Sequence, residues 1–129
     1  MNIQHIRSII KQIESAPSKV DKIIERSSYG ICLTDSNGMF TTVNRAYLDI
    51  YRYSKKEVLN KHYSKVVPES DRKLLKEIKQ EFLNSKSNHK KELRVHTKDN
   101  KSITVNVESI YTTVFLLPHR ITFIEPVEY

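Results

Sequence analysis

Isoleucines at the start of the chain recur every three or four residues. The residues Ile3, Ile6, Ile10 and Ile13 follow this spacing, which places an apolar stripe along one face of a helix. The stretch Ser15-Ala16-Pro17-Ser18 interrupts the pattern. It predicts a leading amphipathic helix that stops before Pro17, because proline cannot continue a helix.

A second short helix is predicted directly after this break. Ser18 can cap it, with Asp21 in the capping-box position three residues on. Two apolar runs, Ile31 to Leu33 and Phe40 to Val43, then flank the turn Asp35-Ser36-Asn37-Gly38. Asn-Gly between apolar runs is the strongest short-range hairpin signal, since both residues tolerate positive φ. We therefore expect two antiparallel strands.

Three helix signals follow this hairpin. Asn44 can cap a helix over residues 46–51, and a shorter helix spans residues 55–59. Ser70 can cap a longer helix that reaches about Ser85. The apolar face of that helix carries Leu74, Leu75, Ile78 and Phe82.

The last forty residues alternate between apolar and polar side chains, as half-buried strands do. Lys90 to Thr97 predicts one strand and Ser102 to Leu117 another. Pro118-His119 predicts a break before the final strand, which Pro126 interrupts or places at an edge.

This order of elements resembles the PAS domain family. The residues that carry the resemblance are Asp35, Gly38, Asn44, Tyr53-Ser54, Glu57, Pro68 and the turn Lys98-Asp99-Asn100. The resemblance implies an α+β fold, a five-stranded antiparallel sheet with helices on one face and an extra N-terminal amphipathic helix. It divides the chain into a flanking helix over residues 1–18 and a PAS-like domain over residues 19–129.

Relatives in this family often carry glycine where this chain has Arg52, Asn60 and Asn100. Asparagine is the best substitute for glycine in left-handed backbone, so the two asparagines keep the match. Arg52 is the departure that leaves the local turn geometry open.

Composition limits the function classes. The chain has 129 residues and one cysteine, Cys32, so it is long enough for one unstapled core and has no internal disulfide. No apolar run is long enough to span a membrane, and the first residues do not form a secretory signal. We expect a cytoplasmic protein without a membrane partner.

The net charge of +7 leads to the hypothesis that the protein binds nucleic acid. Residues 52–101 hold fifteen lysines and arginines against seven aspartates and glutamates. These cations are spread over helix faces and turns, with few aromatic residues to stack on bases. A solvated basic surface is the favoured interpretation, and a small nucleic-acid-binding regulator remains the alternative, which a salt titration separates.

The chain lacks the residue patterns of a metal site, a cofactor site or an enzyme. The five histidines have no i, i+4 partner, which argues against zinc. Haem-binding PAS relatives commonly use a histidine in the long helix and flavin-photoreactive ones a cysteine near Asn60 to Ser64, and this chain has neither. We expect no cofactor and no catalysis; a haem or flavin sensor is the weaker alternative, and an absorption spectrum tests it.

Several tyrosines lie near the predicted space between the sheet and the helices, and a buried tyrosine needs a hydrogen-bond partner for its hydroxyl group. Two interpretations follow: the tyrosines line a small cavity with polar edges, or they belong to a packed core. Seven residues occupy helix or strand positions that we expect to face this space, and they would line such a cavity: Tyr47, Ile50, Leu75, Ile78, Val105, Val107 and Tyr111.

The resemblance implies a sensory or signalling module that acts by homodimerisation, by contact with a signalling partner in trans and by the sensing of a small ligand. The stripe Ile3, Ile6, Ile10 and Ile13 lies outside the PAS-like segment and needs a surface to cover it. We expect it to form a homodimer interface; the alternative is that it folds back on its own sheet.

Overall fold

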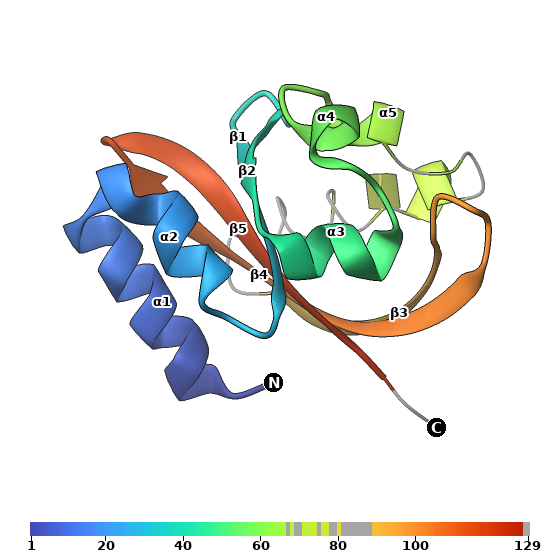
Figure 1. Cartoon of the computed structure of the whole chain (residues 1–129), viewed down its shortest axis with the longest axis horizontal. Coiled ribbons are helices and arrows are strands. Elements are labelled where there is room, and N and C mark those ends of the chain that lie inside the picture. Colours follow the sequence, from blue (N-terminus) through green and yellow to red (C-terminus); the bar gives the residue numbers. More distant parts are fainter. Residues whose placement is uncertain (67, 69–70, 75, 78–79, 81–88, 128–129) are drawn as a thin grey trace.

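The computed structural model describes residues 1–127 except 67, 69–70, 75, 78–79 and 81–88. One antiparallel sheet with strand order β2-β1-β5-β4-β3 runs through the molecule (Figure 1). Its strands are β1 (Gly30–Asp35), β2 (Phe40–Val43), β3 (His89–His96), β4 (Ser102–Val114) and β5 (Leu117–Pro126). The α+β fold class predicted from the sequence is confirmed.

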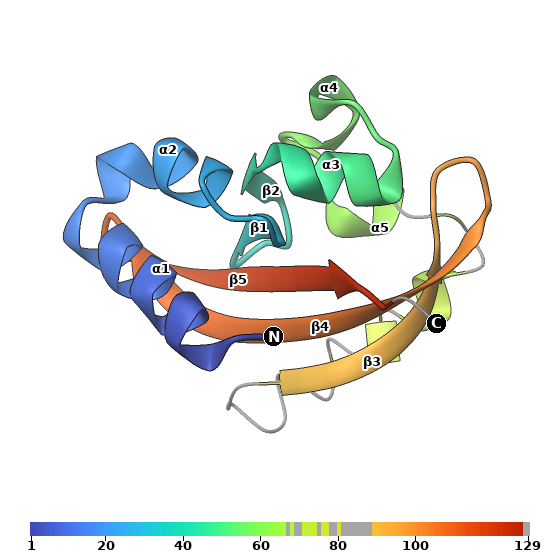
Figure 2. The same cartoon turned by 60° about the horizontal axis from the view of Figure 1, so that its bottom comes forward.

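Helices lie on both faces of this sheet. The helical elements are α1 (Ile3–Ser15), the 3-10 turn η1 (Pro17–Lys19), α2 (Val20–Glu25), α3 (Arg45–Tyr51), α4 (Lys55–Val58) and α5 (Tyr63–Val66). Residues 71–74, 76–77 and 80 are also helical, whereas the rest of the long helix predicted from Ser70 to Ser85 lies outside the described residues. Figure 2 shows α1 on one side of the strands and α3 on the other.

The outer face of the sheet, which carries Ile31, Leu33, Ile121 and Phe123, is covered by α1 and α2. These residues form one cluster with Ile6, Ile9, Ile13, Ile23 and Ile24. Ile6 and Ile13 are 0% exposed, so the chain itself covers them and they cannot form a dimer interface. Of the predicted stripe, only Ile3 and Ile10 keep partial exposure.

The start of α2 differs from the predicted capping box. Ser18 lies inside η1, and the N-cap position of α2 is Lys19, without a side-chain cap bond. Asp21 instead accepts a hydrogen bond from the Thr42 hydroxyl, a residue 21 positions later. The carboxylate therefore ties α2 to the edge strand β2, which a local sequence pattern does not reveal.

Left-handed backbone occurs at the three positions where relatives in the family often carry glycine. Arg52, Asn60 and Asn100 have φ values of 65°, 63° and 64°. Arg52 thus takes the left-handed conformation that glycine would take, and its guanidinium lies 3.2 Å from the Asp99 carboxylate. The turn geometry that the sequence left open is kept despite the larger side chain.

The break between β4 and β5 is three residues earlier than predicted. β4 ends at Val114, which pairs with Leu117, and Phe115 and Leu116 form the two-residue turn. Both turn residues have positive φ, 51° and 65°. Pro118 lies inside β5 and pairs with Thr113, so the prediction of a break at Pro118-His119 was wrong.

Asn44 joins the two faces of the sheet. Its Oδ1 accepts hydrogen bonds from the backbone N–H groups of Ile31 and Tyr47, at 2.8 and 2.9 Å. Its Nδ2 donates to the carbonyls of Ile24 and Tyr29, both at 2.9 Å. The predicted helix cap is confirmed, and the same side chain, 1% exposed, also ties α2 to β1.

We predict that Asn44→Ala lowers the free energy of unfolding by about 3–5 kcal/mol, because it leaves several buried backbone groups without partners. Asn2→Ala is the matched control. Asn2 caps α1 with the same carboxamide but at an exposed site, so its loss costs about 1 kcal/mol. Urea unfolding measures both, and equal losses would contradict the special role of Asn44.

We further predict that the double substitution Phe115→Asn, Leu116→Gly stabilises the protein by about 1–3 kcal/mol. A two-residue turn with positive φ at both positions strongly prefers Asn-Gly, and bulky side chains are strained there. Both native side chains are largely exposed, so little packing is lost. A lower urea midpoint for the variant would contradict the strain.

Candidate functional site

A cavity of about 90 Å³ lies between the inner face of the sheet and the helices α3 to α5. Side chains of β1, β2, β3, β4 and β5 line it together with residues of α3, α5 and the segment around residue 71. Aliphatic side chains gather toward β3, where Leu93 and Val95 contribute. The side chains of Thr34, Ser109, Arg120 and Thr122 gather at the other end of the cavity, whereas Asp71 and His96 add polar groups at the end near β3.

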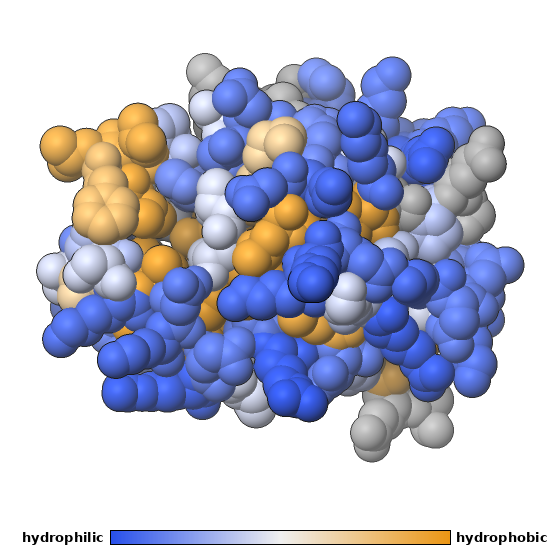
Figure 3. Space-filling view, turned by 45° about the horizontal axis from the view of Figure 1, so that its top comes forward, coloured by the Kyte–Doolittle hydropathy of each residue, from blue (hydrophilic) through white to orange (hydrophobic). Residues whose placement is uncertain are grey.

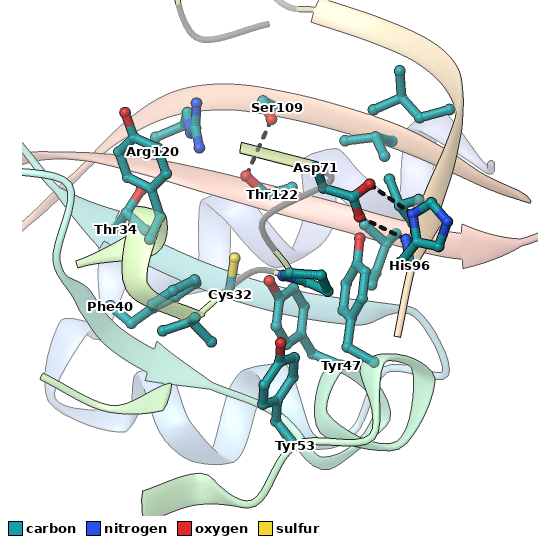
Figure 4. A pocket seen from close by; sticks show the side chains of 18 residues that line it. Cys32, Thr34, Phe40, Tyr47, Tyr53, Asp71, His96, Ser109, Arg120 and Thr122 are labelled. Atoms are coloured by element: carbon teal, nitrogen blue, oxygen red, sulfur yellow. Dashed lines mark hydrogen bonds and ion pairs between the residues drawn. The ribbon is translucent and has the colours of Figure 1, made fainter. Parts of the chain in front are cut away.

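The polar half is built by cross-strand pairing. Thr34 of β1 pairs with Arg120 of β5, and Cys32 pairs with Thr122. Thr122 also pairs with Ser109 of β4, and the two hydroxyl oxygens are 3.1 Å apart. Figure 4 shows Arg120, Ser109 and Thr122 on neighbouring strands with Cys32 beside them.

Aromatic side chains form the helical side of the cavity. The ring centroids of Phe40 and Tyr47 are 6.2 Å apart, and those of Tyr47 and Tyr51 are 4.9 Å apart. Tyr53 and Tyr63 add to the same lining. Burial raises the pKa of Tyr47 and Tyr51 well above the ordinary value, so both phenols stay protonated and can donate a hydrogen bond.

Asp71 closes one end of the cavity through His96 of β3. Its carboxylate accepts hydrogen bonds from the backbone N–H of His96 at 2.6 Å and from the ring Nδ1 at 2.8 Å. The Asp71 side chain is 6% exposed. Both carboxylate oxygens are thus engaged, which anchors the helical residues that begin at Asp71 on the far strand of the sheet.

Cys32 lies in the middle of the cavity. Burial raises the pKa of its thiol from 9.0 to about 11, an effect that the nearby Arg120 charge and hydrogen bonds to Tyr47 and Thr122 partly oppose. At neutral pH the thiol is therefore protonated and a poor nucleophile. Its place suits a small packing group with a weak donor, as the sequence suggested.

The structure separates the predicted cavity residues. Tyr47 and Val107 line the cavity, and Val105 and Ile50 pack in the apolar cluster next to it. Leu75 and Ile78 lie outside the described residues. Tyr111 shares the parity of Val107, but it is 45% exposed and does not line this cavity, because β4 extends beyond the helices that cover it.

Sequence reasoning missed the polar side chains of the site. Thr34, Ser109, Arg120 and Thr122 look like ordinary polar positions of alternating strands. The available signal was their alternation with buried Leu33 and Ile121, which assigns them to the other face of the sheet. Nothing local shows that this face is also covered.

Two negative findings apply to the described part of the chain. It contains no cluster of three or more histidine, cysteine, aspartate or glutamate side chains that could hold a metal ion. None of its helices combines the length and apolar character needed to cross a bilayer.

Comparison with protein families places most of the chain in one of them. Residues 18–113 match the model of the family described as PAS fold. None of the curated proteins matches the sequence.

Several solved structures share the fold at low sequence identity. The PAS domain of Bordetella pertussis BvgS is 20% identical with a TM-score of 0.71, and the match covers 89% of this chain and 88% of that one. A PAS domain from a two-component sensor histidine kinase is 17% identical with a TM-score of 0.66, covering 88% and 98%. The Rhodobacter sphaeroides LOV protein is 10% identical with a TM-score of 0.69, covering 98% and 69%.

We predict that stability falls as pH rises from 9 to 11. The folded chain holds the Cys32 proton up to about pH 11, whereas the unfolded chain releases it near 9.0. The unfolded state therefore binds fewer protons in this window, and Cys32 alone costs about 2 kcal/mol by pH 11. Tyr47 and Tyr51 act in the same direction.

Urea unfolding of the native chain and of Cys32→Ala at pH 7, 9, 10 and 11 tests this. The alanine variant loses packing at every pH but has no thiol to titrate, so its stability declines less steeply. If the free energy of unfolding fell equally with pH in both proteins, Cys32 would not be a cause of the loss of stability.

Proposed function

The chain belongs to the PAS fold family, and from this premise we propose that it is a sensory or signalling module that binds a small ligand in the cavity above the sheet. Similar folds occur in a sensor histidine kinase and in a LOV protein, which supports a role in signal transduction. Fold alone does not assign a ligand, so the proposal depends on the cavity itself.

The observation that carries this proposal is the convergence of polar groups at one end of the cavity. Arg120, Thr34, Ser109 and Thr122 come from three strands and meet at one end of the cavity. Ligand sites typically combine an apolar lining with a few placed polar groups, and this cavity has both.

The size of the cavity limits the ligand. A cavity of about 150 Å³ accommodates benzene. At about 90 Å³ this one takes a molecule smaller than that ring. A haem or a flavin is far larger, which disfavours the cofactor-bearing alternative.

The charge of the polar end indicates a small organic anion. Arg120 lines the cavity, and its charge opposes the rise that burial causes in the pKa of Cys32 and Tyr47. A guanidinium has five N–H donors, so it can hold protein partners and still donate to a carboxylate. A short carboxylic acid would place its carboxylate at Arg120 and its carbon chain toward Leu93 and Val95.

The nucleic-acid alternative is less favoured. Part of the basic region is neutralised locally, since Arg52 pairs with Asp99 and Lys98 with Glu57. Affinity for nucleic acid that falls steeply with salt would revive it. We infer a noncovalent role in which ligand binding changes contacts with a second chain or with a signalling partner in trans.

We predict that propionate binds at Arg120 and that its uncharged analogue propionamide binds at least tenfold more weakly. Arg120→Gln should remove this preference, because the variant keeps donors but not the charge. Arg94→Gln is the matched control, since Arg94 is an exposed arginine of β3 whose side chain hydrogen-bonds Ser102 outside the cavity.

Amide chemical shifts of 15N-labelled protein, titrated with each compound, measure the binding. The shifts should centre on β1, β4 and β5 at the cavity. Equal responses of the native chain and Arg120→Gln would contradict the anion site, and shifts centred on another surface would place the ligand elsewhere.

A further inference from the structure

The β4–β5 turn projects three large apolar side chains into solvent. Phe115, Leu116 and Leu117, here named the hairpin tip, are 63%, 94% and 62% exposed. In the described part of the chain, the other exposed large hydrophobic side chains are Tyr111, on the same hairpin, and Ile3. Figure 3 shows an apolar projection at the left edge of the molecule, where β4 and β5 end in Figure 1. Contiguous exposed apolar side chains mark interaction surfaces on soluble domains.

The backbone of the tip makes this exposure more informative. Phe115 and Leu116 both have positive φ, a region that bulky residues rarely occupy. Asn-Gly would form the same turn without strain and without exposed apolar area. Strain at an exposed site points to a constraint other than folding, and here the side chains themselves are the feature that would be lost.

The tip is built for an apolar medium that surrounds it. The apex residue Leu116 and both of its neighbours are exposed, and residues 114–118 carry no charge. A groove on a protein would cover one side of such a projection and leave the other side in water, whereas lipid would cover every side. Strand pairing continues up to Val114 and Leu117, so the hairpin makes its backbone hydrogen bonds internally, as an apolar medium requires.

Basic side chains accompany the tip. Figures 1 and 2 both place the end of α1 and η1 beside the β4–β5 turn. Residues 1–19 contain three exposed cations and one exposed acidic residue, namely Arg7, Lys11, Lys19 and Glu14. Residues 109–124 of the hairpin contain no aspartate or glutamate. The tip and the elements beside it therefore carry net positive charge, which complements an anionic surface.

One acidic side chain lies on the strand next to the hairpin. Asp35 of β1 pairs with His119 of β5. Its Oδ1 accepts hydrogen bonds from the backbone N–H groups of Asn37 and Met39, at 2.9 and 3.0 Å. The carboxylate is thus bound within the β1–β2 turn and is not presented together with the tip.

The position of the cations fits a shallow insertion. Lys11 and Ile110 line the same hollow along α1, and Phe115 follows five residues after Ile110. At about 3.4 Å per residue the tip reaches about 17 Å beyond Ile110. Insertion by about 5–10 Å leaves Lys11 about 10 Å from the lipid surface, close to one Debye length at physiological salt. Its charge therefore still attracts anionic headgroups while the tip is inserted.

We propose that the hairpin tip inserts into the surface of an anionic phospholipid bilayer, with Arg7, Lys11 and Lys19 facing the headgroups. The tip supplies apolar contact and the cations supply charge, and peripheral binding needs two such signals because one alone is marginal. Insertion to this depth needs only a turn, so the expectation of no membrane partner, which rests on the length of a spanning run, does not bear on it. The cavity takes no part, so this proposal and that of a small ligand stand or fall separately.

Co-sedimentation of the full chain with vesicles tests the proposal. The vesicles contain phosphatidylcholine with about 30% phosphatidylserine, or phosphatidylcholine alone. The native chain should bind the anionic vesicles at least tenfold more tightly. Phe115→Asn, Leu116→Gly should weaken this binding at least tenfold while its fold becomes more stable, so the loss cannot come from unfolding. Asn100→Gly is the matched control, because it relaxes a left-handed turn residue at the other end of β4 and should bind like the native chain.

A second pair of variants separates local charge from net charge. Lys11→Gln with Lys19→Gln should weaken binding to the anionic vesicles at least threefold. Lys55→Gln with Lys56→Gln removes the same charge from α4, which lies away from the tip in Figures 1 and 2, and should have a smaller effect. Equal losses for the two pairs would show that net charge, and not this surface, drives the binding, which overturns the proposal.

Tryptophan fluorescence then locates the inserted element. The chain contains no tryptophan, so Leu116→Trp reports on the tip alone. Its emission should shift to the blue on anionic vesicles and be quenched by brominated lipid, whereas Lys56→Trp, at an exposed position of α4, should show neither change. Bound Leu116→Trp without quenching, or full binding by the Phe115→Asn, Leu116→Gly variant, overturns insertion of the tip. A native chain that binds no vesicles, and that uses the tip to contact a second copy or another protein, overturns the membrane as the partner.

Discussion

The buried carboxamide of Asn44 is the interaction on which the two halves of this fold depend. Its four hydrogen bonds hold the end of α2, the entry to β1 and the start of α3 in fixed positions. Glu25 of α2 adds a second link between the helices of the two faces, because its carboxylate accepts a hydrogen bond from the backbone N–H of Arg45 in α3 at 2.6 Å. A buried amide with every donor and acceptor satisfied rigidifies its surroundings. The hydrogen bonds of Asn44 therefore fix the positions of β1 and α3, which both form walls of the cavity.

Strand pairing in the sheet then positions the polar side chains of the cavity. Pairing of β1 with β5 and of β5 with β4 places Thr34, Arg120, Thr122 and Ser109 side by side, although the sequence spreads them over almost ninety residues. Asp71 and His96 fix the opposite end. Side chains of all five strands and of the helices α3 and α5 line this space, so the cavity lies where the helices of the inner face meet the sheet.

The outer face has a different character. Its core is apolar and is covered by α1 and α2, whereas the apolar side chains of Phe115, Leu116 and Leu117 at the β4–β5 turn stay exposed. The chain keeps Phe115 and Leu116 in strained backbone where smaller residues would be more stable. The strands β4 and β5 contribute side chains both to this outer core and to the cavity, so the two faces share the same pair of strands.

Local patterns in the sequence determined the amphipathic α1, the strand alternation, the Asn44 cap and the turn at Gly38, because each depends on residues close together in the chain. The sequence also indicated the fold through a family resemblance, and with it the left-handed positions of Asn60 and Asn100, whereas the turn geometry at Arg52 stayed open until the structure was known. Only the tertiary structure decided that α1 buries Ile6 and Ile13 on its own sheet, that Tyr111 extends past the cavity and that Arg120 joins Thr34 at its polar end. Alternation assigns a side chain to a face, but which elements cover that face, and where the cover stops, depends on contacts between residues far apart in the chain.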